Sequence, residues 1–198
     1  MDIEKVVYLL REGKLVIVPH DTVYGIIGDA SSENVIRSIY EVKHRDYRKP
    51  LIMLVSSVDM LKEYVLELNE IEKDLINCYW PGKLTIILKK SNKVSNLITS
   101  GSDCVGVRFP DNQDLLKIIE MLNKPVISTS ANLSNQDTIT NVEMLDQDIV
   151  DKVSYIYDGG EIKRASSTIV RVINNKIEIL RDGELGKDIR NRYKGIIV

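Results

Sequence analysis

The sequence predicts an α/β fold, in which one twisted, open, mixed parallel and antiparallel sheet is flanked by helices within a single domain, residues 1–198. Short apolar runs rich in β-branched residues, such as 15–18 and 51–55, are typical of strands covered on both faces. Amphipathic helical stripes separate these runs. Near the end, two strand-like segments flank Asn174 and Asn175, a residue pair that suits a tight hairpin turn.

The helices are predicted by apolar residues at helical spacing. Ile3, Val6, Val7 and Leu10 form the first stripe, and Gly13 follows where helices commonly end. The second stripe, at residues 35–40, follows a pair of serines that are suited to cap a helix. The later helical stripes occupy residues 60–65, 71–79 and 115–122.

The strands are predicted by apolar or alternating runs too short for helices. Residues 19–29, between the first strand and the second helix, are expected to form a loop. The predicted strands occupy residues 15–18, 51–55, 84–89, 104–109, 125–129, 154–157, 168–173 and 177–180.

Composition narrows the class of protein. Charged residues make up 28% and hydrophobic residues 43% of the 198, as in ordinary globular domains. No apolar run approaches the roughly 18–20 residues of a membrane span, and no signal peptide pattern is present, so we expect a cytoplasmic protein. Cys78 and Cys104 lie far apart and without histidines at ligand spacing, which argues against a zinc site or a disulfide framework.

One short segment is strongly basic. The net charge is −2, yet residues 43–49 carry four cations in seven positions. The overall balance argues against a general nucleic-acid coat, whereas the local density indicates an anion site.

Four polar segments adjoin predicted strands, and we expect them to meet at the carboxyl edge of the sheet, where open α/β sheets usually bind ligands. Each also has a purely structural explanation: turn chemistry, a solvated helix end, a helix cap or a strand edge. His20 is interpreted as loop structure. The segments are 19–25, 43–49, 128–132, and 166–168 combined with 181–183.

The sequence has no nucleophile elbow, Walker loop or dinucleotide glycine motif. If ATP binds, its phosphates would therefore be held by separate cations, and its other atoms by hydroxyl and amide groups. The candidate cations are Lys43, Arg45, Lys49 and Arg181, and the candidate polar groups are Ser130, Asn132 and Thr138.

Taken together, the segments resemble one family, the YrdC-like threonylcarbamoyl-AMP synthases, whose fold is also described as similar to dihydroxybutanone-phosphate synthase. The resemblance covers a core of about 5–183 and leaves 184–198 as a C-terminal tail. Each motif is weak alone, but their shared order is specific. The motifs are PHDTVYG (19–25), KHRDYRKPL (43–51), WPGKLT (80–85), VGVRFP (105–110), STSAN (128–132), YDGG (157–160), SSTIV (166–170) and ILRDG (179–183).

The resemblance implies roles for individual residues. Mg²⁺ is implied as a companion of ATP, without protein side chains as ligands. The implied catalytic residues are Lys43, Arg45, Ser130 and Asn132. The implied ATP contacts are Arg45, Lys49, Cys104, Ser130, Asn132, Thr138 and Arg181, and the implied threonine contacts are Thr22, Arg108, Ser128 and Ser167.

The implied reaction joins L-threonine, bicarbonate and ATP into threonylcarbamoyl-AMP, with release of pyrophosphate. A threonylcarbamoyl transferase complex would then use this product to modify an adenosine in tRNA. The basic segment also allows a weak RNA contact. Four positions depart from the usual pattern of the family: His20, Leu54, Asn135 and Asp182.

Other classes remain as alternatives. An RNA-binding module without adenylate-forming activity would use the basic segment, although one Phe and one Trp offer little for base stacking. A regulatory nucleotide-binding domain would bind ATP without turnover. Related domains of hydrogenase-maturation proteins usually occur in longer chains with zinc fingers, which this sequence lacks.

Overall fold

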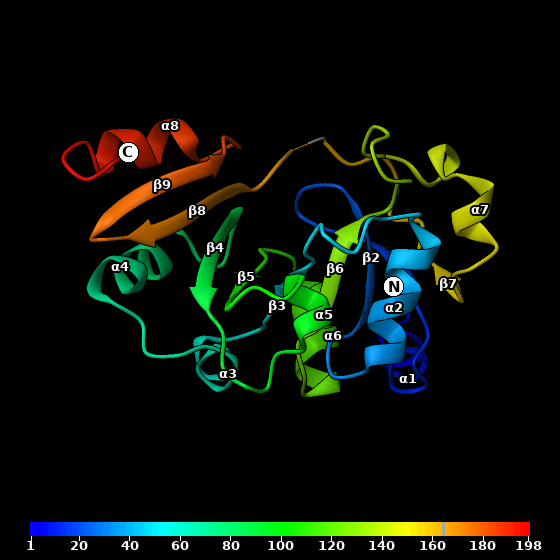
Figure 1. Ribbon diagram of the computed structural model, residues 1–198. Helices are drawn as coiled ribbons and strands as arrows, with labels where there is room; N and C mark the ends of the chain where they lie inside the picture. Colours follow the sequence, from blue (N-terminus) through cyan, green and yellow to red (C-terminus); the bar gives the residue numbers. More distant parts are fainter. Residues whose placement is uncertain (164) are drawn as a thin grey trace.

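The computed structural model describes residues 1–163 and 165–198, and within these ranges one nine-stranded mixed sheet organises the chain (Figure 1). The strand order is β7-β1-β2-β6-β3-β5-β4-β8-β9. Parallel and antiparallel pairs alternate irregularly, so the predicted fold class is confirmed. The strands are β1 (Val16–Pro19), β2 (Tyr24–Asp29), β3 (Ile52–Leu54), β4 (Leu84–Lys89), β5 (Cys104–Arg108), β6 (Val126–Ser130), β7 (Tyr155–Ile156), β8 (Thr168–Ile173) and β9 (Lys176–Arg181).

The predicted helices form and begin at polar caps. Ser32 caps α2, Asn112 caps α6, and Asn69 forms a reciprocal capping box with Glu72 at the start of α4. Three short helices lie outside the predicted stripes: α5, α7 and α8. The helices are α1 (Ile3–Arg11), α2 (Glu33–Val42), α3 (Val58–Tyr64), α4 (Glu70–Tyr79), α5 (Asn96–Thr99), α6 (Gln113–Leu122), α7 (Gln147–Val150) and α8 (Gly186–Arg192), with a 3₁₀ turn at Val142–Met144.

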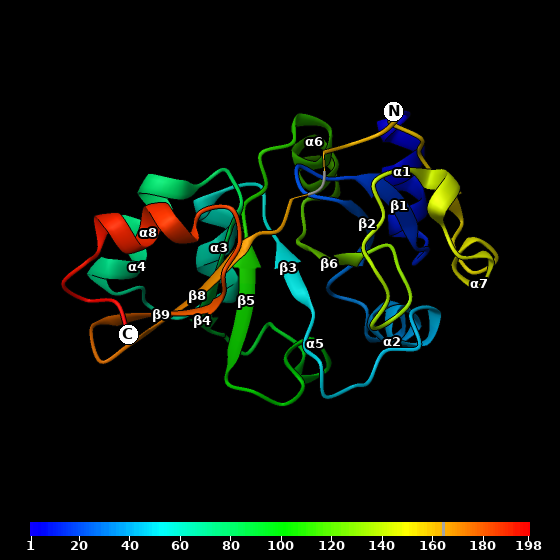
Figure 2. The same ribbon diagram turned by 90° about the horizontal axis from the view of Figure 1, so that it is seen from above.

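The helices cover the two faces of the sheet unequally. Figure 2 shows α1 and α6 on one side of the strands and α2 and α5 on the other. The apolar side chains of α1 and α6 pack on β1, β2, β6 and Leu54 of β3. The opposite face packs against α2, α3 and α4 in a larger core. The face beneath α1 and α6 is therefore covered over only part of the sheet, and this decides where a ligand has room.

The prediction of a loop over residues 19–29 is wrong in its second half. Residues Tyr24–Asp29 form β2, whose six residues are all buried between β1 and β6. The connection to β1 is a tight turn closed by the His20 N–H donating to the Val23 carbonyl (3.2 Å). Two glycines interrupt the apolar run of β2, which hides the strand from pattern reading.

The C-terminal hairpin confirms the predicted turn. Asn174 and Asn175 join β8 to β9 with φ values of 50° and 59°, the left-handed pair that a two-residue type I′ turn requires. The segment predicted as a tail also packs on the body: Ile189 of α8 is buried, and Tyr79 donates to Asp188 (2.6 Å). Within the described residues, no helix combines the length and apolarity needed to cross a membrane.

Candidate functional site

A cavity of about 820 Å³ opens on the part of the sheet that α1 and α6 leave uncovered. Every second side chain of a strand faces the same side, and the wall positions of β3, β4 and β5 follow this alternation. Apolar partners such as Ile86 and Val107 point the other way, into the core. The strand positions on the wall are Gly25 (β2), Ile52 and Leu54 (β3), Thr85 and Ile87 (β4), Cys104, Gly106 and Arg108 (β5), Ser128, Thr129 and Ser130 (β6), Ile169 (β8), and Leu180 and Arg181 (β9).

The predicted location at the carboxyl edge of the sheet is wrong. Strands β6 and β4 run antiparallel to their neighbours β3 and β5, so the carboxyl ends of adjacent strands do not meet at one edge. The polar segments meet instead on one open face.

The structure brings most, but not all, of the predicted site residues to this cavity. In the part of the chain that the structure describes, Lys43, Lys49 and Asn132 do not line it. The predicted residues that line it are Thr22, Arg45, Cys104, Arg108, Ser128, Ser130, Thr138, Ser167 and Arg181.

Lys43 is a buried clamp. Its ammonium group donates to the backbone carbonyls of Ser130 and Asn132, and it lies 3.4 Å from Asn132 Oδ1. The Lys43 carbonyl accepts from the Ser134 N–H (3.0 Å). Burial, with the nearby charge of Arg45, lowers the pKa of Lys43 to about 7. Lys43 therefore connects the end of α2 to the loop that follows β6, and it supports the cavity wall without lining it within the described residues.

Asn132 and Lys49 organise the same loop. The Asn132 amide donates to the carbonyls of Leu133 (3.0 Å) and Gln136 (2.7 Å), which folds the loop back on itself. Lys49 reaches across from the basic segment and donates to Asn135 Oδ1 (2.7 Å). These two predicted contacts thus hold the loop that carries Thr138 rather than facing the cavity.

The end of α2 aims Arg45 at the cavity. His44 takes a left-handed conformation (φ 49°), and the N–H groups of His44 and Arg45 return to the carbonyls of Glu41 and Tyr40, as in a Schellman cap. The Arg45 guanidinium then donates to the carbonyls of Lys49 (3.0 Å) and Pro50 (2.9 Å). Backbone and side chain are both fixed, so the cation is preorganised.

A second polar cluster in the cavity wall contains Arg181, Ser167, Thr85, Arg108 and Thr22. Arg181 donates to the Ser167 carbonyl (2.9 Å) and hydroxyl (2.6 Å), and Ser167 Oγ lies 3.0 Å from Thr85 Oγ1. Arg108 donates to Thr22 Oγ1 (3.3 Å). Burial, with Arg181 nearby, lowers the pKa of Arg108 to about 10, so Arg108 remains a cation at neutral pH.

The charges on the wall favour an anionic ligand. Among the described residues, the ionised side chains that line the cavity are Arg45, Arg108 and Arg181 against Asp137. Serine and threonine hydroxyls lie between these cations. The arrangement suits a ligand with several phosphate or carboxylate oxygens.

Sequence reasoning missed two kinds of site residue. Thr85 lies within a strand, where the alternation of Leu84 and Ile86 with Thr85 is the signal that identifies its face. Asp21 forms a buried ion pair with Arg108, which no local pattern reveals because the two residues are far apart in sequence.

His20 belongs to the cavity wall, and the interpretation as loop structure alone is incomplete. The side chain is buried (7% exposed), and its ring lies over Gly25 so closely that any Cβ there would overlap it. Among the described residues, Nε2 has no hydrogen-bond partner. Burial, reinforced by Arg108, lowers the pKa of His20 to about 3.

We expect His20 to steepen acid unfolding. The unfolded chain takes up a proton at His20 below about pH 6.5, whereas His20 in the native state stays neutral until about pH 3. As the pH decreases through this window, the free energy of unfolding therefore decreases by up to about 1.4 kcal/mol per pH unit. Denaturant unfolding between pH 7 and pH 4 checks this. His20→Thr should flatten the slope and His44→Gln, at an exposed histidine, should retain it; equal slopes in all three proteins would contradict the assignment.

The described residues contain no group of three or more His, Cys, Asp or Glu side chains placed to hold a metal ion. Both cysteines are free.

The chain is similar to proteins that share this fold. A family model for Sua5, YciO and YrdC proteins, described as "Telomere recombination", matches residues 8–183. The threonylcarbamoyl-AMP synthase of Pyrococcus abyssi is 37% identical over 177 residues, which cover 89% of this chain and 52% of that protein. The putative threonylcarbamoyl-AMP synthase of Methanocaldococcus jannaschii is 34% identical over 175 residues, covering 88% of this chain and 82% of that protein.

The fold of this chain also matches a solved structure of a relative. The crystal structure of P. abyssi Sua5 complexed with L-threonine matches 99% of this chain and 58% of that chain, with a TM-score of 0.92 and 35% identity. This chain therefore spans about half the length of the P. abyssi relative. Because the family model covers most of the chain and relatives above 30% identity cover nearly all of it, the resemblance is confirmed, and the chain belongs to the Sua5/YciO/YrdC family.

Proposed function

We propose that this chain is a threonylcarbamoyl-AMP synthase, a nucleotidyltransferase that converts L-threonine, bicarbonate and ATP to threonylcarbamoyl-AMP and pyrophosphate. The observation that carries the proposal is one cavity of about 820 Å³ with Arg45, Arg108 and Arg181 in its wall. This size falls within the roughly 300–1,000 Å³ of small-molecule sites. The names of the relatives and the threonine complex of P. abyssi Sua5 support the same activity.

Two adjoining groups of lining residues suit different substrates. The amino acid would lie among Thr22, Arg108, Ser128 and Ser167, with its carboxylate on Arg108. The nucleotide would lie along the following lining residues, which lead from the basic segment to the C-terminal hairpin: Arg45, Cys104, Ser130, Thr138 and Arg181. Lys43, Lys49 and Asn132 would act through the loop after β6, which they hold in place.

The reaction then proceeds in two balanced steps. The threonine amine attacks the carbon of bicarbonate, the C–O bond to the hydroxyl group breaks, and the departing hydroxide takes a proton from the amino group, so the products are a carbamate and water. A carbamate oxygen attacks the α-phosphorus, the bond between the α- and β-phosphates breaks, and pyrophosphate leaves with the bonding electrons. Both reactants in the second step are anions, so Arg45 and Arg181 would stabilise the charge that they bring together.

Mg²⁺ is proposed to enter with ATP. Protein sites for Mg²⁺ commonly combine one or two carboxylates with substrate phosphates and water. The resemblance implies no protein side chain as a ligand, but Asp137, a carboxylate on the cavity wall, fits that mode. When bound, the ion would supply further neutralisation of the triphosphate.

The product is a mixed anhydride, and a second enzyme must consume it. We propose a threonylcarbamoyl transferase complex acting on tRNA as that partner, in the cytoplasm. The basic segment, where Arg48 is 89% exposed, would offer at most a weak RNA contact beside a net charge of −2.

A mass measurement tests the activity directly. The protein is incubated with ATP, L-threonine and ¹³C-bicarbonate, and the adenylate is detected rapidly by mass spectrometry. We expect a product that carries one ¹³C and requires all three substrates. ATP binding without turnover would instead indicate the regulatory alternative, and ATP cleavage that is independent of threonine would contradict the synthase activity.

A further inference from the structure

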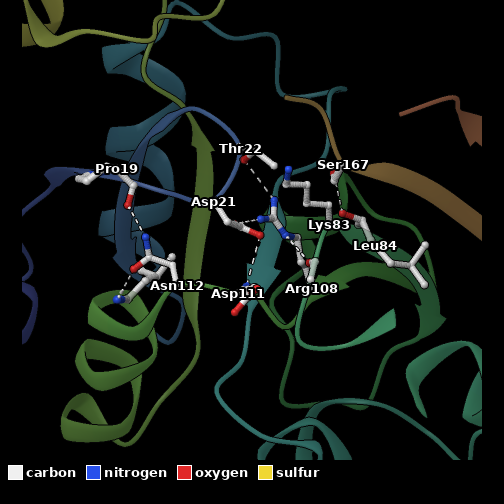
Figure 3. A network of polar contacts seen from close by, with 12 residues as sticks. Pro19, Asp21, Thr22, Lys83, Leu84, Arg108, Asp111, Asn112 and Ser167 are labelled. Carbon is white, nitrogen blue, oxygen red and sulfur yellow. Dashed lines mark hydrogen bonds and ion pairs between the residues drawn. The ribbon is translucent and has the colours of Figure 1, made fainter. Parts of the chain in front are cut away.

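Arg108 is surrounded by acceptors from the protein itself. Its Nε donates to the Gly82 carbonyl (3.1 Å), Nη1 donates to Thr22 Oγ1 (3.3 Å), and Nη2 forms an ion pair with Asp21 Oδ1. Figure 3 shows the guanidinium between Asp21 and Thr22. The side chains of Arg108 and Asp21 are 7% and 8% exposed, so the pair is desolvated on both sides.

The two partners of Arg108 occupy different places. Thr22 and Arg108 line the cavity, whereas Asp21 is absent from the wall within the described residues. The second Asp21 oxygen accepts from the Asp111 N–H (3.3 Å), in the segment that leaves β5. Asp21 therefore lies behind the guanidinium and joins the turn after β1 to the end of β5.

This placement has two physical consequences. A guanidinium buried without a counter-charge is strongly unfavourable, and Asp21 supplies that charge before any ligand arrives. A guanidinium has five N–H groups, of which three have the partners named above, so two remain for a ligand. With one side held by Asp21 and Gly82, the plane of the fork is set, and paired recognition of a carboxylate depends on that plane.

We propose that Asp21 is a positioning residue that fixes Arg108 for the carboxylate of the amino-acid substrate. The identity of that amino acid as L-threonine rests on the proposed function. Asp21 would act through Arg108, without touching the substrate, and would set the affinity for the amino acid rather than for ATP.

Asp21 could act on Arg108 in two opposite ways, and these predict opposite changes in the affinity for the amino acid when Asp21 is removed. If Asp21 competed with the substrate carboxylate for Arg108, its removal would tighten amino-acid binding. If Asp21 positions Arg108, its removal must weaken binding, because the guanidinium can then turn away from the productive orientation.

The test compares Asp21→Asn and Asp21→Ala with the wild-type protein. We expect Asp21→Ala to raise the Kd for L-threonine, measured by calorimetry without ATP, and the KM for threonine by about ten- to a hundredfold. Asp21→Asn keeps the size and one acceptor but removes the charge, so its effect should be intermediate. The KM for ATP should remain unchanged in both, a split that general loss of structure would not produce.

Asp29→Asn is the matched control. Asp29 is also a buried carboxylate paired with a cation, Lys124 (3.3 Å), but it lies at the far end of β2 and does not line the cavity within the described residues. Its replacement should leave the threonine Kd unchanged. Asp21→Glu should restore part of the affinity that Asp21→Ala loses.

The outcomes separate the two proposals. Unchanged or tighter threonine binding in folded Asp21→Asn would overturn the role of Asp21 while leaving the proposed function intact. Absence of both threonine binding and adenylate formation in the wild-type protein would overturn the proposed function itself. If circular dichroism shows that Asp21→Ala is unfolded, the nearly isosteric Asp21→Asn decides the question.

Discussion

Replacing Arg45 with alanine is expected to reduce threonine- and bicarbonate-dependent pyrophosphate release by about 10²–10³-fold. The guanidinium lines the cavity and is already oriented by the carbonyls of Lys49 and Pro50. The carbamate and the triphosphate repel one another, and a fixed cation lowers that repulsion without reorganisation during the reaction. The cap at His44 forms through backbone groups, so the variant should fold normally.

Arg48→Ala is the matched control for Arg45→Ala. Arg48 belongs to the same basic segment and carries the same charge, but it is exposed, pairs with Asp46 (2.5 Å) and does not line the cavity within the described residues. A coupled assay of pyrophosphate release under saturating ATP distinguishes the two. Near-normal turnover by Arg45→Ala, or equal losses in both variants, would reject a specific role for Arg45.

Replacing Lys43 with methionine is expected to lower the free energy of unfolding by about 2–4 kcal/mol and activity by about 10²-fold or more. Methionine fills much of the buried volume but donates no hydrogen bonds. The Ser130 and Asn132 carbonyls then lose the Lys43 ammonium as a donor. The loop after β6 would shift, and the lining residues Ser130 and Thr138 would move with it.

Urea unfolding and limited proteolysis of the loop 131–138 measure the effect of Lys43→Met. Lys62→Met is the control, because Lys62 is exposed on α3 and pairs with Asp59 (2.8 Å) within the same helix. We expect that variant to remain within the small range of surface substitutions. A loss of activity in Lys43→Met without a loss of stability or faster cleavage would indicate instead that Lys43 contacts substrate directly.

Local patterns predicted much of the architecture. The β-branched runs became β1, β3 and β6, and the Asn174-Asn175 pair became the predicted hairpin turn. The stripe of Ile3, Val6 and Leu10 became α1, one of the two helices on the cavity side of the sheet. These elements were readable because their side-chain periodicity and capping are properties of neighbouring residues.

Other features had no local signal. Strand β2 contains Gly25 and Gly28 instead of a continuous apolar run, and it is a strand because β1 and β6 pair with both of its edges. The predicted carboxyl-edge site failed because strand direction depends on pairing between distant segments. The role of Lys43 as a clamp depends on carbonyls 87 and 89 positions away along the chain.

The sequence by itself determined the family, the fold class, most helices and strands, and the residue types that bring cations and hydroxyls to one site. The tertiary structure alone decided which of those side chains face the cavity, that Asp21 neutralises Arg108 behind its wall, and that His20 is buried against Gly25. The reason is physical: periodicity and capping act between neighbours, whereas burial, ion pairing and cavity shape arise only when segments distant in the chain meet across the sheet.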